Sequence, residues 1–73
     1  MNEQEFQDAL STALQELAWM AEDDEYPDTL PADLAEVREV RTFDAAGVLT
    51  QNKGLVVTLA DGSELQVTIV QSR

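Results

Sequence analysis

The C-terminal segment, residues 54–70, carries the pattern that most constrains the fold. Two runs rich in β-branched residues flank Asp61 and Gly62, which is typical of a β-hairpin. A two-residue loop would mix apolar and polar side chains on both faces, whereas a three-residue loop starting at Ala60 separates them. The sequence therefore predicts the second register, with Gly62 in the left-handed position of the turn. The apolar face of the hairpin then comprises Leu55, Val57, Leu59, Leu65, Val67 and Ile69.

Residues 2–22 form the second clear element. Asn2 followed by Glu5 is typical of a helix-capping box, and neither glycine nor proline occurs before Pro27. We expect a helix of about five turns whose apolar stripe packs on the apolar face of the hairpin. The stripe comprises Phe6, Ala9, Leu10, Ala13, Leu14, Leu17, Met20 and Ala21.

The residues between these elements are expected to form a loop over 23–30, a short helical turn over 31–35 and a turn over 44–47. Residues 36–43 fit a continued helix or an edge strand, and their β-branched and charged alternation favours the strand. Residues 48–50 are expected to add a brief strand. The predicted fold is a single α+β domain, residues 1–73, with one long N-terminal helix packed on a three- or four-stranded antiparallel sheet that ends in the hairpin.

The net charge of −11 is distributed unevenly along the chain. Residues 1–44 contain thirteen acidic residues against Arg38 and Arg41, whereas the remaining residues are neutral in sum. Such a negative field repels nucleic acid and attracts basic surfaces. We therefore expect no direct binding of nucleic acid.

The acidic residues are concentrated just after the predicted helix. Four consecutive acids precede Tyr26 and Pro27, and this run allows three interpretations: a solvated linker, a partner-binding patch or a divalent-cation site. The spacing lacks the alternation of a calcium loop, so no metal site is assigned. The candidate partner-binding residues are Trp19, Glu22, Asp23, Asp24, Glu25, Tyr26 and Asp28.

Trp19 departs from the pattern of the helix. At about 100° per residue it falls on the polar side, nearly opposite the apolar stripe. Either the helix bends or ends early and Trp19 packs under the following loop, or Trp19 is an exposed aromatic anchor for a partner.

Several function classes are disfavoured by composition. The chain has no histidine and no cysteine, and its glycines at 47, 54 and 62 form no phosphate-binding loop. We expect no enzymatic activity, no cofactor and no membrane association. The N-terminus lacks the basic and apolar regions of a signal peptide, which favours a cytoplasmic protein.

The segment from Phe43 to Thr50, followed by the hairpin from Gly54 to Val70, resembles short acidic proteins of bacteriophages and prophages. In size and charge the chain is also similar to phage inhibitors of host defence, including anti-CRISPR proteins and DNA mimics. That class has no shared motif, so the resemblance implies no particular functional residue. It implies an inhibitor acting in the host cytoplasm.

The function expected from the sequence is a non-catalytic acidic binding protein that occupies a basic, nucleic-acid-binding surface of a host protein. The alternative is a structural or assembly module, such as a homodimer, with no inhibitory role. An edge strand or a sheet face would then pair with another copy of the chain.

Overall fold

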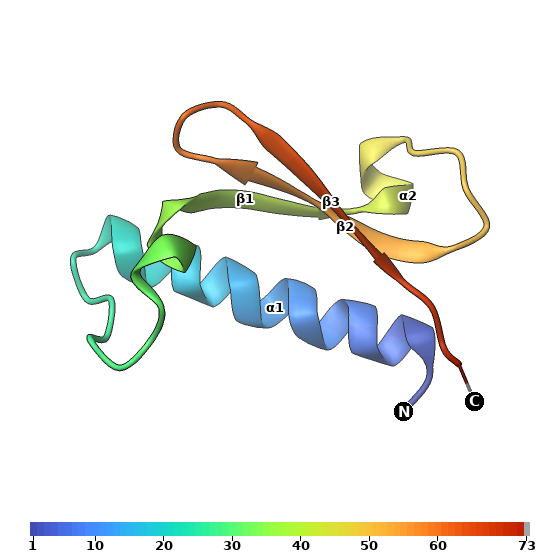
Figure 1. Cartoon of the computed structure of the whole chain (residues 1–73), viewed down its shortest axis with the longest axis horizontal. Coiled ribbons are helices and arrows are strands. Elements are labelled where there is room, and N and C mark those ends of the chain that lie inside the picture. Colours follow the sequence, from blue (N-terminus) through green and yellow to red (C-terminus); the bar gives the residue numbers. More distant parts are fainter. Residues whose placement is uncertain (73) are drawn as a thin grey trace.

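The computed structural model describes residues 1–72 and places an N-terminal helix across one face of a three-stranded sheet (Figure 1). The elements are α1 (Glu3–Glu22), the 3-10 helix η1 (Ala32–Glu36), β1 (Val37–Thr42), α2 (Phe43–Ala46), β2 (Lys53–Leu59) and β3 (Glu64–Ile69). The strands are antiparallel in the order β1-β2-β3. The predicted α+β class, with a long helix on an antiparallel sheet, is confirmed.

Helix α1 begins with the predicted capping box. The side chain of Asn2 accepts a hydrogen bond from the backbone amide of Glu5 at 2.8 Å, and the carboxylate of Glu5 accepts one from the amide of Asn2 at 3.3 Å. Two amides that have no partner inside the helix are thereby satisfied.

The hairpin has the predicted register. Leu55 pairs with Val67, Val57 pairs with Leu65, and the amide of Leu59 donates to the carbonyl of Ser63 at 2.9 Å. Gly62 has φ of 88°, which is the left-handed conformation that a three-residue loop requires.

The connecting segments follow the expectations except at residues 48–50. Residues 37–42 form the strand β1, and the helical turn before it is η1. The turn over 44–47 is the end of the short helix α2, which Gly47 closes with φ of 77°. The expected strand at 48–50 is wrong: the chain leaves α2 in a loop that returns to β2 without running along a sheet edge, and Leu49 is 99% exposed (Figure 1).

The main core lies between α1 and the strands β1 and β2. Its buried members are Ala18, Val37, Val40, Leu55 and Val57, and Leu10, Leu14, Leu59 and Val67 pack against them while partly exposed. Leu14 and Val67 therefore share a core, as the sequence predicts, although neither is fully buried.

Only part of the apolar stripe of α1 lies on the sheet, which corrects the sequence expectation. The helix buries Gln7 and Ala18, whereas Phe6 is 46% exposed. The amide of Gly54 donates to Oε1 of Gln7 at 3.0 Å, beyond the last β1–β2 pair at Thr42, so the glutamine supplies the acceptor where β1 has ended. This polar contact explains why a glutamine lies at the centre of the buried face.

The hairpin is also less covered than predicted. Leu65 was expected in the core and is 54% exposed, while Ile69 is only partly buried. The physical reason is width: one helix about 10 Å across covers about two strands at ~4.8 Å spacing. Helix α1 packs chiefly on β1 and β2, so the inner face of β3 stays open.

A smaller buried cluster lies on the other face of the sheet. Helix α2 packs there against β1 and β2, on the side opposite α1 (Figure 1). Phe43 and Val56 are both buried, and the ring of Phe43 lies directly over Gly54. The absence of a side chain at residue 54 is what lets the ring approach the strand.

Candidate functional site

The acidic run forms the C-terminal cap of α1. The amide of Glu25 donates to the carbonyl of Met20 at 2.8 Å, and the amide of Asp24 donates to the carbonyl of Ala21 at 3.4 Å. These two bonds define a Schellman motif, in which the residue after the cap adopts a left-handed conformation. Asp24 occupies that position with φ of 59°.

This cap is unfavourable for the residues that form it. Glycine is the usual residue at the left-handed position, and within residues 1–72 Asp24 is the one non-glycine residue with positive φ. The negative end of the helix dipole also disfavours carboxylates, and the last turn of α1 has no basic residue to offset them. The acidic run therefore lowers the stability of the helix end that it caps.

Trp19 lies exposed beside this cap. Helix α1 continues to Glu22, and Trp19 is 57% exposed, so the following loop does not bury it. Residues three and four positions apart are neighbours on a helix surface, which puts Glu22 and Asp23 next to Trp19. Helical spacing thus places the exposed aromatic side chain near two carboxylates, one in the last turn of α1 and one at its C-cap.

The other candidate residues have different surroundings. Tyr26 is partly buried, and its hydroxyl donates to the carbonyl of Pro31, so it closes the loop between α1 and η1. Asp24, Glu25 and Asp28 are exposed on the loop itself. Tyr26 therefore shapes the loop, whereas the exposed carboxylates form its charged surface.

Basic residues neutralise little of this charge. Among residues 1–72, the ion pairs join Arg41 to Glu39 at 3.2 Å and to Glu64 at 3.4 Å, both on the sheet. Arg38 donates to the carbonyls of Ala35 and Val37. Neither of these two ion pairs includes an acid of the run at the end of α1.

Two further features, a cluster of metal-ligating side chains and a membrane-spanning helix, were sought among the described residues. No group of three or more metal-ligating side chains in residues 1–72 is arranged to hold an ion. In the same residues, no helix combines the length and the apolar character needed to cross a membrane.

Comparison with known proteins gives no match. Neither a protein-family model, nor a curated protein, nor a solved structure matches this chain.

One surface was missed at the sequence level, and we name it the α1–β3 groove. It consists of two hollows between α1 and β3 that share no lining residue. One is lined by Leu14 from α1, Leu34 from η1, and Leu65 and Val67 from β3, and the other by Phe6 from α1 and Ile69 from β3, among others. Apolar periodicity assigned most of these residues to the core. The signal that could have found the groove is the number of strands, because one helix covers about two strands and the predicted sheet has three or four.

Proposed function

We propose that this protein is a non-catalytic acidic binding protein whose site is the Trp19 side chain with the acidic cap of α1, and that it occupies a basic surface of a partner protein. The observation that supports the proposal is that Trp19 is exposed in the last turn of α1, directly before a run of exposed carboxylates that cost stability at that helix end. Aromatic residues at interfaces supply the apolar contact area, and charges around them steer the encounter.

The location of the run is the reason to prefer this function over a solvated linker. A linker needs charge only to stay in water, and it gains nothing from acids at the negative end of a helix dipole. A surface selected to meet lysine and arginine side chains gains from every carboxylate, because complementary charge raises the association rate. The cost at Asp24 is then offset in the complex.

The resemblance to phage proteins adds a class of partner. Under this proposal the partner is a host protein, and its basic surface is one that normally contacts nucleic-acid phosphates. The carboxylates of residues 22–25 and Asp28 would take the place of those phosphates.

The test uses immobilised wild-type protein and a triple variant, Asp23→Asn, Glu25→Gln and Asp24→Asn, to capture partners from a bacterial host lysate. A protein retained by the wild type alone is then purified and titrated against both. We expect the triple variant to bind at least tenfold more weakly, with a shallower dependence on salt. Trp19→Ala should weaken the same complex by ~2 kcal/mol or more.

The matched control carries the same change in net charge at sites away from both Trp19 and the cap: Glu3→Gln in the first turn of α1, Glu39→Gln and Asp44→Asn. It should retain most of the affinity, and all variants should keep the wild-type circular dichroism spectrum.

Equal losses of affinity in both triple variants would mean that only net charge matters. Unchanged binding by the Asp23, Asp24 and Glu25 variant would make the acidic run a solvated linker. The rival assembly function predicts self-association that salt does not weaken.

A further inference from the structure

The apolar stripe of α1 faces two directions. Gln7, Leu14 and Ala18 point to the sheet, but at about 100° per residue the stripe is centred near Phe6, Leu10 and Leu17, about a quarter turn away. Phe6 is exposed, whereas Leu10 and Leu17 are half-buried. One side of the stripe is therefore left beside the sheet instead of on it.

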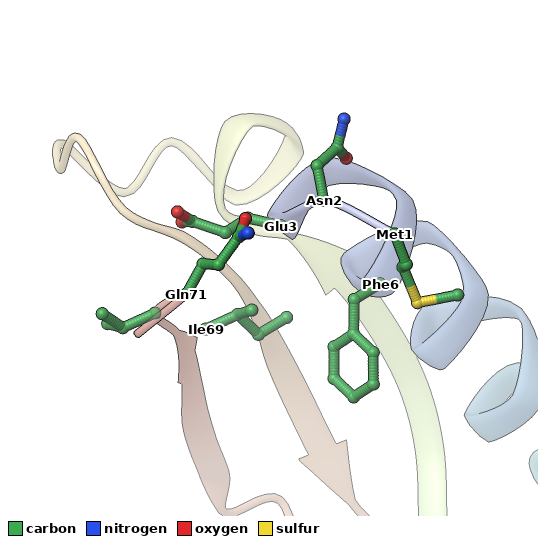
Figure 2. Close-up of a pocket in the computed structure, with 7 residues that line it drawn as sticks. Met1, Asn2, Glu3, Phe6, Ile69 and Gln71 are labelled. Atoms are coloured by element: carbon green, nitrogen blue, oxygen red, sulfur yellow. The ribbon is translucent and has the colours of Figure 1, made fainter. Parts of the chain in front are cut away.

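That side of α1 faces the open inner surface of β3. At one end, Leu14, Leu34, Leu65 and Val67 surround a hollow of ≈ 300 Å³. At the other end, Phe6 and Ile69 contribute to a hollow of ≈ 250 Å³, and Figure 2 shows both side chains lying between the start of α1 and the end of β3. The α1–β3 groove thus has one apolar wall on α1 and another on β3.

The dimensions of the groove match a helix. Leu65 to Ile69 spans ~13 Å along β3, and one further residue at each end brings the length to ~20 Å, which is between three and four helical turns. A second helix lying beside α1 at about 8–10 Å would rest over β3 and would touch both walls. The strand that α1 leaves uncovered and the exposed side of α1 therefore form a seat for one more helix.

The charges around the groove determine which helix fits. Asp33 and Glu36 border the larger hollow, and Glu3 borders the smaller one. Helix α1 itself contains five acidic and no basic residues. An occupant with an apolar face and lysine or arginine at its flanks would meet opposite charge at both ends.

A second copy of this chain fits less well. Two copies packed groove to groove would bring two acidic α1 helices together, each part of a chain of net charge −11. Pairing through the two β3 edges would leave the α1 helices about four strand spacings apart, ~19 Å, whereas packed helices lie about 8–10 Å apart. The groove would then be widened and still open.

We propose that the α1–β3 groove binds a cationic amphipathic helix of a partner protein. The groove lies on the opposite side of α1 from Trp19, so this is a second interface, separate from the proposed function of the acidic cap. The apolar face of the helix is buried on Leu14, Leu65 and Val67, and its basic flanks lie against Glu3, Asp33 and Glu36.

The probe is a synthetic Leu/Lys helix of about 18 residues, five turns, with leucine at helical spacing. The comparison peptides have the same composition in scrambled order and the same pattern with glutamate for lysine. Calorimetry should show that the protein binds the Leu/Lys helix at least tenfold more tightly than either one. In NMR spectra, the methyl signals of Leu14, Leu34, Leu65 and Val67 should shift on binding.

Two exposed residues of the groove allow a test that leaves the main core intact. Leu34→Ser and Leu65→Thr together should weaken binding at least tenfold, whereas Leu49→Thr removes a leucine that is 99% exposed outside the groove and should change nothing. Asp33→Asn with Glu36→Gln should reduce the salt dependence. The triple variant of the acidic cap should bind the peptide within about threefold of the wild type at physiological salt, since its charges lie beyond the groove.

Three outcomes would overturn the proposal. Equal binding of the scrambled peptide would show charge attraction without a groove, and unchanged binding by the Leu34 and Leu65 variant would place the peptide elsewhere. In sedimentation velocity, a wild-type dimer that Leu65→Thr converts to monomer would show that a second copy fills the groove.

Discussion

Replacing Gly54 by alanine should unfold most of this domain, although the position looks undemanding in sequence. Gly54 lies in β2 with ordinary backbone dihedrals, so the effect has nothing to do with a left-handed conformation. A Cβ at this position would lie 2.5 Å from Cζ of Phe43, and still closer to Cε2 of that ring and to the carbonyl oxygen of Val67. Ordinary contacts between carbon atoms are about 3.5–4.0 Å.

The magnitude follows from what must move. The oxygen of Val67 belongs to the β2–β3 ladder and cannot shift without disturbing the pairing, and overpacking of this kind costs ~1–3 kcal/mol. The ring of Phe43 is buried, and forcing it outward loses a further ~1.5–3 kcal/mol of burial. Together they give roughly 2.5–6 kcal/mol, comparable to the ~3–5 kcal/mol that stabilises a domain this small.

Urea unfolding followed by far-ultraviolet circular dichroism measures the loss. The control is Gly47→Ala, because Gly47 has φ of 77° and nothing within 4 Å of the added Cβ; it should cost only ~1 kcal/mol of backbone strain. Phe43→Leu in the Gly54→Ala background should recover part of the loss, giving a coupling of ~1 kcal/mol or more. A Gly54→Ala protein as stable as Gly47→Ala, or strict additivity with Phe43→Leu, would refute the packing of the ring on the glycine.

Two further predictions concern the turns. Asp24→Gly should raise the free energy of unfolding by ~1 kcal/mol, because it removes the left-handed strain and one charge at the helix end. Asp24→Asn should give only the part of this gain that is due to charge. Chemical unfolding of the three proteins would contradict this account of the cap if the wild type, with aspartate, were the most stable. The Ser63 hydroxyl, and then the Ser63 amide, lower the pKa of Asp61, so its contribution to stability is present above the usual aspartate pKa and is lost as pH falls through the lowered value. Ser63→Ala should move this pKa toward its usual value in an NMR titration, and no movement would assign the shift to another cause.

The hairpin was predictable because its constraints are local. Alternation of side chains leaves one register that separates the two faces, and Gly62 marks the turn that this register needs. The capping box at Asn2 and Glu5 is local in the same sense. Wherever neighbours in sequence decide the conformation, the structure follows the expectation.

The rotation of α1 was not predictable from periodicity. The stripe offers eight apolar residues, and periodicity alone places its centre on the sheet. The actual orientation buries Gln7 and Ala18, and it includes a long-range contact in which Gln7 supplies an acceptor to Gly54 where β1 ends. The exposure of Leu65 has a similar cause, since the number of strands that one helix covers is a property of the assembled layers.

The positions of the two proposed interfaces constrain any partner that uses both. At about 100° per residue, Trp19 lies about 140° around the axis of α1 from Phe6 in one direction and about 140° from Leu14 in the other. A flat surface therefore cannot contact the acidic cap and the α1–β3 groove at once. Under the two proposals, a single partner would have to wrap around α1, with a folded basic surface on the side of Trp19 and a cationic helix in the groove. Two separate partners would instead bind independently, so that loss of the acidic run removes one and loss of Leu34 and Leu65 removes the other.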